Sequence, residues 1–354
     1  MHILFFVPYP IGQAASQRFR FEQYFDLLVK NGHSYEVRPF WDINIWHLLY
    51  CKGHIIKKII GLINGYWGRI SCLLSINRFD KVFIHREVTP LGLPLFEYLI
   101  AKVFKIPLIY DFDDTIWLHD HNISRNSLLS MLKYPKKVSA ICRWSYKISC
   151  GNSYLANYAR QYNSSVYIIP TTIDTAKYHV PQHTDNQPLV IGWTGTHSTI
   201  PYLEMLLPAL EKLSTKQYFI FKVICNVPPT FDLPGLKFIE WKKEQEIEDL
   251  NSIDIGIMPL VDNAWTKGKC GFKILQYMAL KKATVASAVG VNTEIIDHGH
   301  NGLLCSNQSE WLYSLELLML DEALRTRLGQ NGRTLVEQKY SVASNSANFL
   351  KLFI

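Results

Sequence analysis

Two successive series of short apolar runs, each run followed by a segment with helical spacing, constrain this chain more than any other feature. The first series is MHILFFVPY, DKVFIHR, KIPLIYDFDD, SYKISCGN and SVYIIPTT, and the second is QPLVIGWTG, YFIFKVICN, LKFIEW, IDIGIMPL and KATVASAVG. Short apolar runs that alternate with helices are typical of buried parallel strands. The sequence therefore predicts an α/β protein with two doubly wound sheets.

The stretch TAKYHVPQHTDNQP separates the two series. It is polar, contains two prolines and has no periodicity, which indicates a linker. We expect a first Rossmann-like domain over residues 1–175, a linker over 176–188 and a second domain from residue 189. Ligands of open parallel sheets bind beyond the carboxyl ends of the strands, so we expect a cleft there, between the domains.

The basic residues are concentrated in the first half of the chain. Residues 1–180 contain 21 Lys and Arg against 12 Asp and Glu, whereas the remainder contains 16 against 18. Such a surface attracts nucleic acid, anionic lipid or phosphorylated ligands. The sequence carries no recognisable nucleic-acid reader motif, so we expect no nucleic-acid partner.

Residues 45–75 have the composition of a helix that lies at a membrane interface. Basic residues are interspersed with apolar and aromatic ones, namely Lys52, Lys57, Lys58 and Arg69 with Trp46, Tyr66 and Trp67. We expect this segment to contact an anionic membrane peripherally, and the alternative is a buried helix with one solvated basic edge. No apolar run approaches the roughly 18 residues that a spanning helix needs.

The seven cysteines are scattered and never form a C-x-x-C pair, which argues against a disulfide framework and against a zinc site. The first apolar stretch has no preceding Lys or Arg and is broken by Pro8 and Pro10, so it is typical of a buried strand and not of a signal peptide. We therefore expect a cytoplasmic protein that is peripherally associated with a membrane.

Two stretches of the second half could bind an anion. After the QPLVIGW run, Gly195 and Thr196 precede Pro201 and an apolar helix, where backbone N–H groups and the helix dipole favour negative charge. The alternative is that Ser198 or Thr199 only caps that helix.

The second stretch is KGKCGFKILQYMA, where a helix is predicted to begin near Gly271. Lys269 then lies at the helix entrance and Lys273 one turn inside it, where both oppose the helix dipole. A diphosphate would offset this unfavourable arrangement. Solvated surface lysines are the alternative.

In the first half, PLIYDFDDTIW places Asp111, Asp113 and Asp114 at the end of a predicted strand. Three carboxylates this close repel one another, so basic groups must neutralise them in part or at least one pKa must rise. The candidate counter-charges are Arg18, Arg20 and Arg86. The alternative is that Asp111 or Asp114 caps the next helix.

The run DIGIMPLVDNAWTKGKCGFKILQYMALKKATVASAVGVNTEIIDHGHNGLL resembles the nucleotide-sugar-binding half of a retaining glycosyltransferase with the GT-B fold, of the family 4 kind. The matching pieces are Met278-Ala279, Ser287 to Gly290, Glu294-Ile295-Ile296 and Asn301-Gly302-Leu303. A loop at Gly12, GNSYLANYA and IIPTTIDTAKY extend the resemblance over nearly the whole chain. It implies a second domain over 189–337 and a helix over 338–354 that packs back on the first domain.

The sequence departs from this family at the usual Glu-x7-Glu pair, which is replaced by Gly268 and Gln276. The resemblance implies that Gln276 binds ribose hydroxyls through its amide and that Lys269 and Lys273 contact the diphosphate, with backbone donors from Gly195 and Thr196. It also places Asp113 at the position of the family histidine. Further candidates for the donor side are Glu294, Gly290 and Trp241, and for the acceptor side or cleft Gly12, Arg18, Arg20, Asp111 and Asp114.

The activity implied is transfer of a hexosyl group, with retention, from UDP or GDP to a lipid-linked or glycan acceptor, in cell-surface polysaccharide or glycolipid synthesis. Lys269, Lys273 and Asp113 are the expected catalytic residues, and no metal or cofactor is expected. Two alternatives stay open. The DFDDT segment also fits the nucleophile motif of haloacid-dehalogenase-like phosphatases, although no paired-Asp segment for Mg²⁺ follows. The chain could also be a non-catalytic partner with the same two-domain shape.

Overall fold

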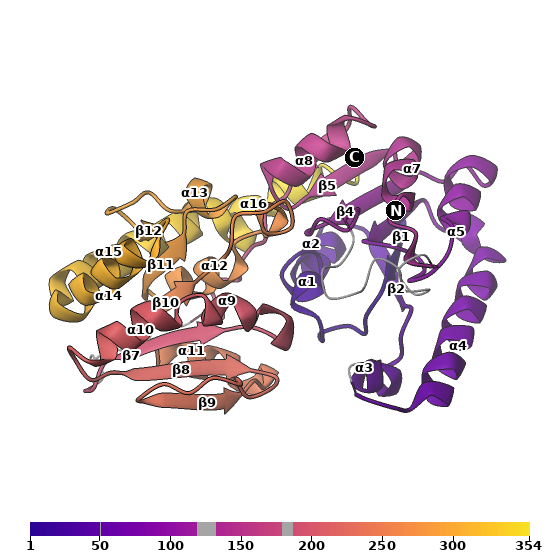
Figure 1. Ribbon diagram of the computed structural model, residues 1–354. Coiled ribbons are helices and arrows are strands. Elements are labelled where there is room, and N and C mark those ends of the chain that lie inside the picture. The colour runs from indigo at the N-terminus through magenta and orange to yellow at the C-terminus, as the bar shows by residue number, and fades with distance from the viewer. Residues whose placement is uncertain (50, 119–131, 179–186) are drawn as a thin grey trace. The chain divides into compact units, whose positions relative to one another are not determined.

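The chain folds into two compact units in the computed structural model, which describes residues 1–49, 51–118, 132–178 and 187–354. One unit comprises residues 1–171 with 345–354, and the other comprises residues 172–344 (Figure 1). Each described unit contains a six-stranded sheet whose paired strands are parallel. The predicted α/β fold with two doubly wound sheets is confirmed, and most of the predicted linker lies outside the described residues.

The sheet of the first unit has the order β2-β1-β3-β4-β5-β6. Its strands are β1 (His2–Val7), β2 (Ser34–Pro39), β3 (Lys81–His85), β4 (Leu108–Phe112), β5 (Lys147–Cys150) and β6 (Val166–Ile168). Its helices are α1 (Ala15–Arg18), α2 (Phe25–Lys30), α3 (Ile43–Leu49), α4 (Ile55–Leu73), α5 (Leu95–Tyr98), α7 (Lys137–Trp144) and α8 (Ser153–Arg160). The sequence did not predict β2, because this edge strand is partly exposed and its polar residues interrupt any apolar run.

The last residues of the chain complete the core of the first unit. Helix α16 (Val342–Leu350) brings Phe349 onto Tyr24, with 4.3 Å between the ring centroids, and Lys81 Nζ donates to the Phe353 carbonyl over 2.7 Å. Phe353 also lies 6.3 Å from Phe83, ring centroid to centroid. Residues from the end of the chain therefore cover part of the first sheet, although they are distant from it in sequence.

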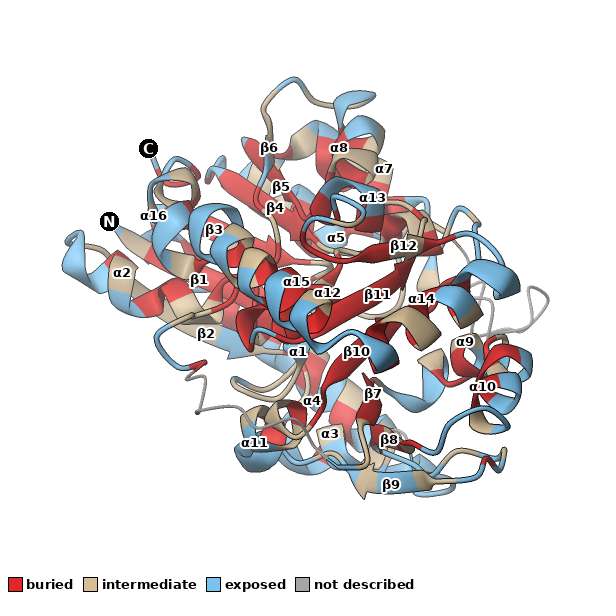
Figure 2. Ribbon diagram, turned by 90° about the vertical axis from the view of Figure 1, so that its left-hand side faces the viewer, coloured by how far each residue is buried: buried red, intermediate tan, exposed pale blue. Residues whose placement is uncertain are grey.

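The sheet of the second unit has the order β12-β11-β10-β7-β8-β9. Its strands are β7 (Val190–Thr194), β8 (Ile220–Cys225), β9 (Leu236–Glu240), β10 (Ile255–Met258), β11 (Ala283–Ser287) and β12 (Leu303–Cys305). Its helices are α9 (Pro201–Glu204), α10 (Leu207–Ser214), α11 (Glu246–Asn251), α12 (Phe272–Ala279), α13 (Asn292–Ile295), α14 (Gln308–Leu320) and α15 (Glu322–Leu335). The central strands β7, β10 and β11 are buried along their length, whereas the edge strand β9 is mostly exposed (Figure 2).

The segment predicted to be one membrane-facing helix forms two helices, α3 and α4. The backbone between them turns at Gly53 (φ +77°) and His54 (φ +56°), a left-handed conformation that no helix continues through. Within the residues that the structure describes, no helix has the length and apolar character needed to cross a membrane.

Candidate functional site

The topology of each sheet fixes where a ligand can bind. In the first unit β1 is flanked by β2 and β3, and in the second unit β7 is flanked by β8 and β10, so the chain reverses its winding direction beside β1 and beside β7. Loops at such switch points diverge and leave room for a ligand beyond the carboxyl ends of the strands. The residues that follow β1 and β3, and those that follow β7 and β10, are therefore the candidates in each unit.

Lys269 and Lys273 lie at the switch point of the second unit. They follow β10 at the start of α12, and Lys273 Nζ stands 5.6 Å from the ring centroid of Trp193, which is on the neighbouring strand β7. Lys269 Nζ stands 5.2 Å from the ring centroid of Trp265. The N-cap residue of α12 is Gly271, which has no side chain to cap the helix. The start of this helix therefore places two lysines at a positive dipole end.

Lys273 is partly buried, and no carboxylate of the described residues pairs with it. Burial and the nearby charge of Lys269 lower the pKa of Lys273 to about 8, because both oppose a positive charge at this position. A bound anion would reverse both effects. Lys273 is therefore a candidate ligand for an anion.

The turn after β7 corrects the prediction for Gly195 and Thr196. The Gly195 N–H donates to the Ile224 carbonyl (3.0 Å), and the Thr196 N–H donates to Thr199 Oγ1 (3.2 Å). Thr196 and Thr199 form a capping box on the turn His197–Thr199, so the capping residue is Thr196, whereas the alternative had named Ser198 or Thr199. Both N–H groups are engaged within the protein, so neither is available to a diphosphate in this conformation.

The other donor-side candidates differ in position. A Cβ on Gly290 would lie 3.0 Å from Lys267 Cα and one on Gly271 would lie 2.3 Å from Ile295 Cδ1, so the Gly290 loop and α13 pack against the start of α12. Glu294, on α13, is exposed.

Gln276 and Trp241 are engaged within the protein. Gln276 is buried, and its amide donates to the Tyr178 hydroxyl (3.2 Å), which uses part of the capacity predicted for ribose. Trp241 Nε1 donates to Glu246 (3.3 Å).

In the first unit, Asp111 is buried and fully committed to neighbouring groups. It is ion-paired with Arg20, one of the predicted counter-charges, and its Oδ2 lies 2.8 Å from His85 Nδ1. Burial alone would raise the pKa of Asp111, but Arg20 and His85 outweigh it and hold the pKa well below its usual range. A buried, paired carboxylate cannot reach a phosphoryl group, so the geometry disfavours Asp111 as the nucleophile of a phosphatase.

Asp113 lies nearer the surface, with 13% of its side chain exposed, and is bound by Arg86. Arg86 Nε and Nη2 stand 2.8 and 2.7 Å from Asp113 Oδ1, and His85 Nε2 stands 3.9 Å from the same oxygen. Burial opposes ionisation, yet Arg86 and His85 lower the pKa of Asp113. The predicted role of Arg86 as a counter-charge is thus confirmed.

The remaining first-unit candidates are Asp114, Gly12 and Arg18. Asp114 accepts from the Thr115 N–H (3.0 Å), Gly12 has φ +77° and donates its N–H to Glu22 (2.9 Å), and the Arg18 guanidinium lies 4.9 Å from the Phe19 ring.

His85 is the site residue that the sequence analysis missed. The strand register pairs His85 with Asp111 and Asp111 with Ser149, so one row across β3, β4 and β5 carries these three side chains, and Arg20 donates to Ser149 Oγ (3.0 Å). The sequence did contain a signal for this row, because each of three apolar runs has a polar residue at or near its end.

The α4 helix presents an apolar surface that we call the α4 outer face. Its members are at least 44% exposed: Ile55, Ile56, Ile59, Ile60, Ile63, Trp67, Ile70 and Leu74. Arg69, counted in the sequence among the membrane-facing basic residues, is instead buried and donates to the carbonyls of Val7, Arg38 and Val88. Tyr66 also points inward and donates to the Leu91 carbonyl (2.6 Å).

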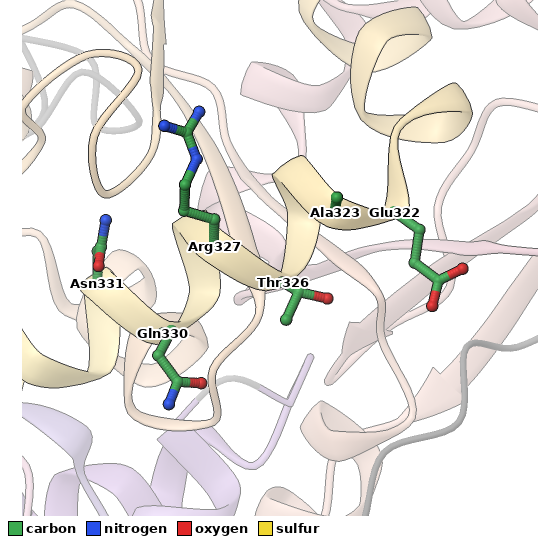
Figure 3. A pocket seen from close by; sticks show the side chains of 6 residues that line it. All are labelled: Glu322, Ala323, Thr326, Arg327, Gln330 and Asn331. Atoms are coloured by element: carbon green, nitrogen blue, oxygen red, sulfur yellow. The ribbon is translucent and has the colours of Figure 1, made fainter.

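A surface hollow of about 660 Å³ lies along α15 (Figure 3). Its lining residues all come from this one helix: Glu322, Ala323, Thr326, Arg327, Gln330 and Asn331. It contains none of the residues selected above, and it does not lie at either switch point, so it is not the candidate site.

Comparisons with known proteins bear on this geometry. Residues 188–321 match the family model described as glycosyl transferases group 1. No curated protein matches the sequence. Among solved structures, sucrose-phosphate synthase from Thermosynechococcus elongatus is similar with a TM-score of 0.71 at 12% identity, over 99% of this chain and 98% of that chain.

Two further structures are similar over essentially their whole length. HepE from Anabaena in complex with UDP has a TM-score of 0.64 at 14% identity, over 100% of this chain and 99% of that chain. A glycosyltransferase from Rickettsia africae has a TM-score of 0.67 at 14% identity, over 99% and 97%. The second unit therefore carries the glycosyl transferases group 1 match, and the whole chain has the GT-B fold of glycosyltransferases.

Proposed function

We propose that this protein transfers a hexosyl group, with retention of configuration, from a UDP- or GDP-linked donor to a lipid-linked or glycan acceptor. Cell-surface polysaccharide or glycolipid synthesis at the cytoplasmic face of a membrane is the context proposed. In this proposal the second unit binds the donor, Lys269 and Lys273 stabilise charge on the departing diphosphate, and the first unit binds the acceptor beside Asp113. No metal or cofactor takes part.

The environment of Lys273 is the observation that supports this proposal most directly. A partly buried ammonium group without a carboxylate partner among the described residues, beside a second lysine and at a helix N-terminus, is unfavourable unless an anion binds. Charge grows on the diphosphate as the sugar bond breaks, so fixed cations at this position favour the transition state over the bound donor. The UDP complexes of HepE support a nucleoside diphosphate as this anion.

Calorimetric titration with UDP and GDP in the presence of EDTA tests the donor site. We expect the wild type to bind one of them, and Lys273→Met to weaken that binding and to lower turnover about 100-fold. Lys212→Met, which removes an exposed lysine of α10, is the matched control and leaves both unchanged. Equal nucleotide affinity in wild type and Lys273→Met would show that Lys273 does not contact the nucleotide. If the wild type bound neither nucleotide, the result would favour the alternative that the chain is a non-catalytic partner.

We also propose that the α4 outer face binds an anionic membrane. Apolar side chains this exposed and this contiguous are unusual on a protein surface without a partner. Lys52, in the loop before this helix, and Lys57, in its first turn, are exposed, which suits anionic headgroups. Arg69 and Tyr66 bind the other face of the helix to the sheet and to the loop after β3.

Co-sedimentation with vesicles tests the membrane surface. The double change Ile63→Ser with Trp67→Ser is expected to reduce binding to phosphatidylglycerol vesicles at least about tenfold, because each buried apolar side chain contributes roughly 1.5–3 kcal/mol. Both residues are exposed in the free protein, so the unfolding temperature should hardly change. Leu320→Ser, at an exposed apolar residue of the second unit, is the control. Undiminished binding by the double variant contradicts the assignment.

A further inference from the structure

The backbone at Arg86 has an unusual conformation. The Glu87 N–H donates to the His85 carbonyl over 2.7 Å, which closes a three-residue turn around Arg86, whose φ is +62°. This form of the turn is rare and strained for a residue that has a side chain. Strain of this kind persists only where surrounding contacts impose it, and it is concentrated at functional sites.

Two hydrogen bonds from strand β4 impose the turn. The Arg86 N–H donates to the Asp111 carbonyl (2.7 Å), and the buried Tyr110 hydroxyl donates to the Arg86 carbonyl (2.7 Å). Both peptide groups of Arg86 are therefore tied to the strand that leads into Asp113. The strained turn directs the guanidinium to Asp113 Oδ1, on which both Nε and Nη2 converge.

His85 adds a second contact on the same side. Its Nδ1 faces Asp111 Oδ2 at 2.8 Å, and because Asp111 is paired with Arg20 and accepts hydrogen bonds, that nitrogen carries a proton. Its Nε2 is buried, makes no hydrogen bond within the described chain, and lies 3.9 Å from Asp113 Oδ1. The imidazole is thus oriented by Asp111 and turned toward Asp113.

We propose that Arg86, aided by His85, is a positioning residue that keeps Asp113 ionised and fixed as a hydrogen-bond acceptor for a sugar hydroxyl. This inference rests on the proposed function and assigns Asp113 a binding role instead of a proton-accepting one. The charges that act on Asp113 include those of Arg86, His85 and Arg20, and Tyr9 and Asp114 act on the charge of Arg86. Arg86 forms an ion pair with Asp113 through Nη2, at 2.7 Å from Oδ1.

The test compares Arg86→Gly with Arg86→Lys. Glycine accepts the positive φ without strain but removes the cation, whereas lysine keeps a cation and the strain. We expect Arg86→Gly to move the acidic limb of the pH profile of kcat/KM upward by at least about one pH unit, because the burial that remains favours the protonated acid. Arg86→Lys should leave that limb near its wild-type position, and nucleotide affinity should be unchanged in both variants.

Lys105→Gly is the matched control. Lys105 is an exposed residue of the first unit that also has a positive φ, +56°. This change relieves backbone strain at a distance from the cluster and should leave the pH profile unchanged. A purely structural Arg86 would instead lower the rate of Arg86→Gly equally at every pH, and that result would overturn the proposal.

A second measurement separates failure of this inference from failure of the proposed function. In protein labelled with ¹³C at aspartate carboxyl groups, the Asp113 resonance is assigned by its loss in Asp113→Asn. Its titration midpoint should rise by at least about one pH unit in Arg86→Gly. An unchanged midpoint defeats the positioning role, whether or not transfer is observed. A shifted midpoint in a protein that transfers no sugar defeats the proposed function and retains the ion-pair assignment.

Discussion

At the scale of single residues, the depressed pKa of Lys273 gives the donor site a pH dependence with a definite sign. The folded-state pKa of about 8 lies below the usual 10.5, so the unfolded chain holds this proton more tightly and folding becomes more favourable as pH rises between these values. Nucleotide binding has the opposite trend, because a diphosphate needs the protonated amine.

UDP affinity should therefore fall about tenfold between about pH 7 and about pH 9, as Lys273 loses its proton. Calorimetry over this range measures the change, since the UDP phosphates stay ionised throughout. In Lys273→Met the affinity should be weak and almost independent of pH, and the unliganded variant should unfold at a slightly higher temperature near pH 7. If the UDP affinity of the wild type did not change with pH, the protonation of Lys273 would not contribute to UDP binding.

Single residues also show what the sequence could reveal about the site. Arg20 and Arg86 could be selected as counter-charges because three crowded carboxylates require cations, a demand that holds whatever the fold. The left-handed turn at Arg86 could not be anticipated, since it depends on hydrogen bonds from β4. The prediction for Gly195 failed for the same reason, because it also depended on a contact with a distant segment. The Gly195 N–H donates to a carbonyl of β8, the strand beside β7 in the sheet.

At the scale of elements, α4 shows how close packing decides which face of an amphipathic helix is buried. A Cβ on Gly61 would lie 2.7 Å from Ile45, and one on Gly65 would lie 2.6 Å from the Phe40 ring, so these glycines allow α4 to approach α3 and the end of β2. Apolar spacing alone predicted a helix here but could not choose between its faces, because isoleucines occupy one side and glycines with Arg69 the other. The helix buries its small side and leaves the large apolar side outward.

At the scale of the whole molecule, each unit has its own sheet, core and switch point, and the chain returns to the first unit at its end. The repeated strand pattern predicted five of the six strands in each sheet. It missed the polar edge strand β2, where one-sided burial leaves no continuous apolar run, and the edge strand β12, which has only three residues. The packing of residues 345–354 on the first unit was implied only by a family resemblance, since local sequence carries no information on contacts between distant segments.

Separate cores predict two thermal transitions that respond to different changes. Phe349→Ala removes a buried ring stacked on Tyr24 and should destabilise the first unit by about 3–5 kcal/mol. Phe221→Ala removes a buried ring from β8 and should destabilise the second unit similarly. In scanning calorimetry UDP should raise the transition of the second unit by mass action, because that unit contains Lys273. Phe349→Ala should lower the transition that UDP does not move, and Phe221→Ala the one that it does. Equal loss of both transitions in Phe349→Ala would show that the two units unfold together.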